Sequence, residues 1–183
     1  MTPTPAIDRL IDDIRLRMTR GRLSEFEVAM YTKRAKQLIT TDPARGFCSL
    51  GMLAAERGNE EEARKNHMKS LEVSSNDPRL QFNYACSLGI LGFHEEAIEI
   101  VLEVIKSEES NLEFLNDIIW LTYETNDDRL PYLLDLWKER TQGEQHPVVE
   151  EIEDAEDVRA ALDSVKVEGT VSWEQIKTEC NLQ

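Results

Sequence analysis

Two stretches of the chain decide its fold: residues 50–63 read LGMLAAERGNEEEA, and residues 84–97 read YACSLGILGFHEEA. A small residue, a glycine and an alanine recur in both, at Gly51/Ala85, Gly58/Gly92 and Ala63/Ala97. Each pair is 34 residues apart. A fixed period of this length is typical of proteins built from stacked helix–turn–helix units. The sequence therefore predicts repeated pairs of helices.

Each recurring residue type has a physical role in such a unit. The small residue, Gly51 or Ala85, lets the second helix of the unit pack closely against the first. The glycine can adopt the positive φ that ends the first helix and turns the chain. The alanine fits the tight contact between the two helices. Asp42-Pro43 and Asp77-Pro78 predict the joins between units, since Asp caps a helix start and Pro is tolerated in its first turn.

This pattern resembles the tetratricopeptide-repeat family across residues 44–109. The resemblance implies an all-α fold, a short right-handed solenoid of antiparallel helix pairs. Carried forward by one period, the repeat predicts helices over Asn111–Glu124 and Asp128–Arg140. Carried backward, it predicts helices over Ile7–Met18 and Glu25–Ile39. We expect about eight helices, with degenerate units at both ends because an end unit lacks a neighbour on one face.

The chain changes character after residue 143, which predicts two parts. Residues 1–143 form the helical-repeat domain, and residues 144–183 form an acidic, helical and partly disordered tail. Apolar residues from Val149 to Val165 recur at helical spacing between acidic ones. Ser172 begins a capping-box pattern that predicts a last short helix with Trp173 and Ile176 on one side.

Composition narrows the function classes. The 183 residues have a net charge of −15, so nucleic acid is a poor partner. Basic and acidic residues number nine and six in 1–46, nine and nineteen in 47–143, and three and eleven in 144–183. This asymmetry either steers a basic partner or only solubilises the chain. No secretory pattern and no apolar stretch of about 20 residues is present, and the three cysteines lack CxxC spacing, so we expect a cytoplasmic protein away from membranes.

Motifs for catalysis or metal binding are absent from the sequence. No GxGxxG, GxxxxGK[ST], GxSxG or HExxH occurs. His67, His94 and His146 have no partner at ligand spacing, and the acidic pairs of the tail lack the glycine and alternating ligands of a calcium loop. We expect no enzyme activity, no cofactor and no metal.

In the tetratricopeptide family the first helix of each pair lines a concave groove that takes a peptide or a helix. The resemblance places these residues in the partner-binding groove: Arg45, Cys48, Met52, Arg79, Phe82, Asn83, Cys86, Trp120 and Tyr123. In this family a carboxylate clamp holds the C-terminal tail of a chaperone. Only Arg79 and Asn83 are similar to its residues, which disfavours a chaperone tail as the ligand. Met and aromatic residues instead suit an amphipathic helix or an apolar anchor. Phe82 and Trp120 are equally compatible with core packing.

These observations lead to a binding module, an adaptor or chaperone-like protein that holds a partner protein or peptide that is basic or carries an amphipathic helix. Self-association through the apolar and aromatic groove residues Met52, Phe82, Cys86, Trp120 and Tyr123 stays open. As an alternative, residues from 163 onward resemble the tail of some small bacterial antitoxins, which implies a tail that wraps a basic partner. The tail could also occupy the groove of its own chain, through Trp173 and Ile176.

Overall fold

The computed structural model describes residues 9–107, 112–156 and 159, and within them the chain is helical without any strand. This confirms the all-α prediction. The helices are α1 (Arg9–Met18), α2 (Glu25–Leu38), α3 (Pro43–Glu56), α4 (Glu60–Val73), α5 (Pro78–Ile90), α6 (His94–Ser107), α7 (Leu112–Glu124) and α8 (Leu130–Arg140). Residues 148–156 form a further helix. None of the helices in these residues combines the length and apolarity that a bilayer crossing requires.

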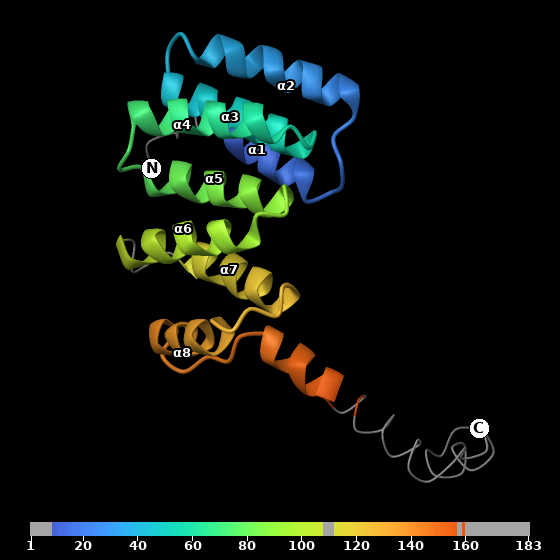
Figure 1. The fold of residues 1–183 in the computed structure, drawn as a ribbon, viewed down its shortest axis with the longest axis vertical. Helices are drawn as coiled ribbons and strands as arrows, with labels where there is room; N and C mark the ends of the chain where they lie inside the picture. The colour runs from blue at the N-terminus through green and yellow to red at the C-terminus, as the bar shows by residue number, and fades with distance from the viewer. Residues whose placement is uncertain (1–8, 108–111, 157–158, 160–183) are drawn as a thin grey trace, which may run out of the picture. The chain divides into compact units, whose positions relative to one another are not determined.

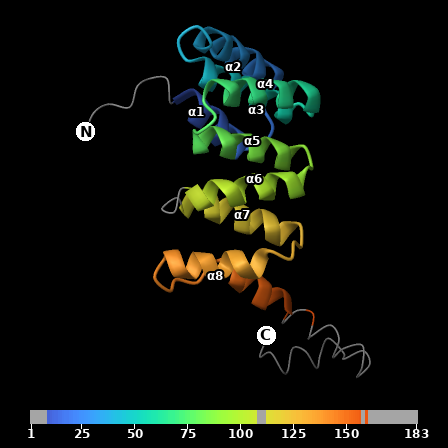
Figure 2. The ribbon, with the colours of Figure 1, turned by 60° about the vertical axis from the view of Figure 1, so that its left-hand side comes forward.

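The chain forms two compact units, Met1–Leu133 and Leu134–Gln183. The division falls inside α8, before the boundary at residue 143 that the sequence predicts. Within the first unit, α2 to α7 follow one another in chain order, as Figures 1 and 2 show. The helix α1 lies beside α3 and α5 in both views.

The predicted joins are confirmed. The Asp42 carboxylate accepts a hydrogen bond from the backbone N–H of Arg45 at 3.1 Å, with Pro43 in the first turn of α3. The Asp77 carboxylate accepts one from the N–H of Arg79 at 3.0 Å, at the start of α5. Each aspartate therefore satisfies an N–H that has no partner within the helix.

The turn after each first helix repeats with the predicted period. Gly58 and Gly92 have φ of +72° and +90°, and Asn126, one period later, has φ of +52°. The residue after each donates its N–H to the carbonyl five positions back, at 2.9, 2.9 and 2.8 Å. This is the hydrogen-bond pattern of a helix end whose last residue is left-handed, where Gly and Asn are favoured. The third turn thus has the geometry of the first two although its sequence has lost the glycine.

The contact between α3 and α4 explains the small residue at position 51. A Cβ atom on Gly51 would lie 2.5 Å from Cδ2 of the buried His67 ring on α4. The His67 Nε2 and the Ser87 Oγ share a hydrogen bond of 2.8 Å, and the ring stacks on Tyr84. The ring therefore has little room to move, and only glycine lets α3 approach it.

Candidate protein-interaction face

The residues predicted to line the groove lie on α3, α5 and α7, but four of the nine are buried. The exposed fractions of Cys48, Met52, Phe82 and Asn83 are 0%, 4%, 1% and 3%. Arg79 is exposed, and the remaining four, Arg45, Cys86, Trp120 and Tyr123, are half-buried. The buried four have no open surface in this conformation, and partner binding by the nine residues stays a prediction.

The helix α1 covers Cys48, Met52 and Phe82. Leu10, Ile11 and Ile14 of α1 are buried in one cluster with Cys48 and Met52. Leu80 at the start of α5 and Tyr31 of α2 belong to the same cluster. The sequence predicts the helix but places it at the start of a repeat unit, where it would not reach α5 and α7. We call the surface that α1 covers, formed by Cys48, Met52, Phe82, Glu113 and Asp117, the inner face.

Arg15 extends the contact of α1 from α5 to α7. Its guanidinium Nη2 lies 2.9 Å from Glu113 Oε1 and 3.6 Å from Asp117 Oδ2. The same guanidinium lies over the Phe82 ring, 5.3 Å from its centroid, and this ring stacks on Phe114 at 4.0 Å. Burial raises the pKa of Asp117, while a hydrogen bond from Asn116 and the charge of Arg15 oppose that rise. The inner face therefore provides an apolar floor and an acidic edge that holds an arginine.

Further ion pairs join α1 to α2. Arg17 binds the Glu27 carboxylate through two nitrogens, and Arg34 binds Asp13 at 3.1 Å. The hydrogen bonds from Arg17 and then Ser24 lower the pKa of Glu27 to about 2. Ser24 and Glu27 also form a capping box at the start of α2. These pairs are partly exposed to water, where an ion pair contributes little to stability.

A cavity of about 220 Å³ remains beside α1 on the inner face. Asn83 lines it, and its buried side-chain oxygen has no hydrogen-bond donor. Such an unsatisfied group is costly when buried. The helix α1 therefore leaves part of this face unfilled. The other residues that line the cavity are Ile11, Asp12, Arg15, Arg45, Asp77, Arg79, Leu80, Phe82, Glu113 and Phe114.

The surroundings of Cys48, Cys86, His67 and His146 are those of residues packed inside the fold. Burial raises the pKa of the Cys48 thiol far above its ordinary value and that of Cys86 to about 12, so both stay protonated at neutral pH. Burial lowers the pKa of His67 to about 3. In the second unit, the Nδ1 of His146 accepts a hydrogen bond from the N–H of Val148. Across residues 9–107, 112–156 and 159, no three His, Cys, Asp or Glu side chains gather as a metal site would require.

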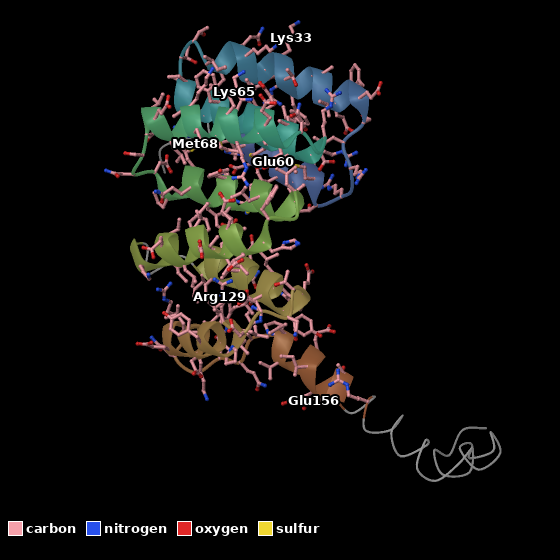
Figure 3. The ribbon with its side chains drawn as sticks, in the orientation of Figure 1. Lys33, Glu60, Lys65, Met68, Arg129 and Glu156 are labelled. Carbon is pink, nitrogen blue, oxygen red and sulfur yellow. The ribbon has the colours of Figure 1, made fainter. Side chains whose placement is uncertain are left out.

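The outer side of α2 offers a second surface. Phe26 is 77% exposed there, and a hollow of about 950 Å³ is lined by Lys33, Lys36 and Arg57 among others. Figure 3 shows Lys33 at the edge of the stack formed by α2. The resemblance to tetratricopeptide proteins directs attention to the first helix of each pair, and sequence reasoning therefore missed this surface.

Trp173 and Ile176 lie outside the described residues. The proposals that the tail wraps a basic partner or occupies its own groove therefore stay predictions. No protein-family model matches the chain, and no curated protein matches it significantly.

Proposed function

We propose that this chain is a non-catalytic protein of tetratricopeptide-repeat type that binds a segment of a partner protein on the inner face. The repeat assignment is supported by the left-handed turns at Gly58, Gly92 and Asn126, which recur every 34 residues with the same hydrogen bond. Helix pairs that share such a turn can stack so that their first helices form one continuous surface.

The observation that carries the binding function is the amphipathic segment already seated on that surface. Ile11 and Ile14 fill the apolar part beside Cys48 and Met52, and Arg15 pairs with Glu113 and Asp117. Amphipathic helices bind grooves in this way, with anchors on consecutive turns. The acidic edge favours a partner segment that carries Arg or Lys.

The test is capture of partner proteins from native lysate with matched variants. Trp120 and Tyr123 lie on α7 with their rings in edge contact at 6.2 Å, and both are half-buried. We expect the Trp120→Ala/Tyr123→Ala chain to lose proteins that the wild-type chain retains, whereas the control Phe26→Ala on α2 keeps them. An unchanged set of captured proteins from the double variant would contradict partner binding along α7, where Glu113, Asp117 and Trp120 share one side of the helix.

A further inference from the structure

We propose that α1 is an internal ligand that closes the inner face, and that the partner displaces it with an amphipathic helix of the same pattern. That pattern has aliphatic residues at positions i, i+1 and i+4, as in Leu10, Ile11 and Ile14, and an arginine at i+5, as in Arg15. The inference rests on the proposed function, since it names the partner segment and the regulation of the same face.

The helix α1 is the shortest of the eight labelled helices, and few side chains dock it. It has ten residues, a length at which an isolated helix is marginal in water. Only three of its side chains are buried, and Leu16 is 59% exposed. Its remaining contacts are the half-buried Met18, the Arg15 guanidinium over the Phe82 ring, and partly exposed ion pairs, which are individually weak. Its docking therefore depends on a small apolar contact.

The helix α1 also fits the inner face incompletely. The cavity of about 220 Å³ beside it and the unpaired oxygen of Asn83 are both on this face. A helix with a larger side chain, or with a hydrogen-bond donor aimed at Asn83, would bury more surface and satisfy this oxygen. A partner side chain that enters this cavity would make contacts that α1 does not make.

The connection between α1 and α2 would have to move for α1 to leave the inner face. Residues 19–24 between α1 and α2 are not helical, and Gly21 in the middle has φ of +116°. A Cβ atom added at Gly21 would meet no other atom within 4 Å, so this glycine lies in open space. Such a glycine can change its backbone angles at little cost. The segment can act as a hinge without disturbing α2, which has its own capping box at Ser24.

Docking of α1 lowers the apparent affinity of the inner face for a partner helix. When a face is open for a fraction of the time, its apparent affinity falls by that fraction. A face closed about 99% of the time would bind a helix about 100-fold more weakly than an open face.

The experiment uses the full chain and a fluorescent synthetic peptide of residues 5–20, titrated by fluorescence anisotropy. We expect the Ile14→Asp chain, in which α1 can no longer dock, to bind this peptide at least about tenfold more tightly than the wild-type chain. The control Leu16→Asp makes the same chemical change on the exposed side of α1 and should bind like wild type. A peptide carrying Ile14→Asp should not bind.

A second set of variants leaves the apolar contact intact. Arg15→Glu opposes Glu113 and Asp117, so it should also raise peptide binding, and adding Glu113→Arg should return it toward the wild-type value. Equal binding by the wild-type and Ile14→Asp chains would overturn the proposal. Loss of cooperative unfolding in Ile14→Asp would also overturn it, because α1 would then be part of the core.

Two further outcomes separate this inference from the proposed function. If the Ile14→Asp chain captures the same partners no better than wild type, the inner face can still bind, but α1 does not mask it. If wild type forms dimers that Ile14→Asp abolishes, α1 is exchanged between copies, and a foreign helix as the occupant is excluded.

Discussion

Two contacts of α3 differ in kind, although both involve a helix packed along it. On one side α4 presses a buried His67 ring against Gly51, with no space for even one added carbon. On the other side three aliphatic side chains of α1 join the apolar cluster around Cys48 and Met52, with ion pairs and a cavity beside them. The comparison indicates that the α3–α4 contact is permanent and that the α1 contact is separable. Interiors packed to full density do not open locally, whereas sparsely packed elements do.

The largest effect is expected from filling the space at position 51. Gly51→Ala places a Cβ against a ring that Ser87 and Tyr84 hold, and overpacking of this kind costs about 1–3 kcal/mol. After the gain in helix propensity of about 1 kcal/mol, we expect a net loss of up to about 2 kcal/mol. Urea unfolding followed by circular dichroism measures it.

The matched control is Gly89→Ala on α5. A Cβ there would lie 3.9 Å from Leu121 Cδ2, an ordinary contact. This change should stabilise the chain by up to about 1 kcal/mol, since alanine is the better helix former. Equal effects at the two glycines would contradict the tight contact at Gly51.

The next effect concerns α1 and is measured by the reactivity of Cys48. In a Cys86→Ser/Cys180→Ser background, Cys48 is fully buried beneath α1 and reacts with a maleimide only when α1 opens. Ile14→Ala should raise the labelling rate at least about tenfold, which corresponds to about 1.4 kcal/mol of lost docking. Leu16→Ala should leave the rate unchanged, and a rate that follows global unfolding in every variant would count against a separable helix.

We expect acid to weaken the contact between α3 and α4. His67 is buried in its neutral form with a pKa of about 3, below that of an unfolded chain. Its contribution is complete above pH 6.5 and is lost progressively as the pH falls toward 3. We expect a loss approaching about 1 kcal/mol between pH 6.5 and pH 5.5.

The control for this prediction is His67→Phe, which removes the titrating group from the same site. Stability measured by urea unfolding at each pH should then change less over this range. The same slope in both chains would show that another group is responsible.

The smallest effect is expected at Arg64, which joins α4 to the next helix pair. Its guanidinium binds Glu96 through two nitrogens, each at 2.8 Å, donates to the Tyr84 hydroxyl, and lies over the Phe93 ring. Because these groups are partly exposed, Arg64→Ala should cost about 1 kcal/mol or less. A double-mutant cycle with Glu96→Gln measures the coupling energy between Arg64 and Glu96. A value near zero would show that this pair does not link the units.

The helix caps and turns could be predicted from the sequence, and the position of α1 in the fold could not. The caps at Asp42 and Asp77 and the turns at Gly58 and Gly92 follow from neighbouring residues, and the structure confirms them. The inner face is assigned to the right helices, but which of its residues are exposed depends on where α1 lies. Nothing in the pattern of α1 specifies the surface that its apolar side covers.

One signal of that placement is present in the sequence. Residues 1–46 have more basic than acidic residues, and residues 47–143 have the reverse. The pairing of Arg15 with Glu113 and Asp117 is one consequence of that asymmetry. Charge alone could not identify the pair, because many exposed acidic residues on the first unit were equally available.

The most direct test of a separable α1 is native-state hydrogen exchange of the unmodified chain, read by mass spectrometry. The account predicts that the amides of α1 exchange at least about 30-fold faster than those of α3 and α4, a difference of about 2 kcal/mol in opening free energy. Equal protection of α1, α3 and α4 would mean that they unfold together, and would contradict the claim that α1 opens the inner face.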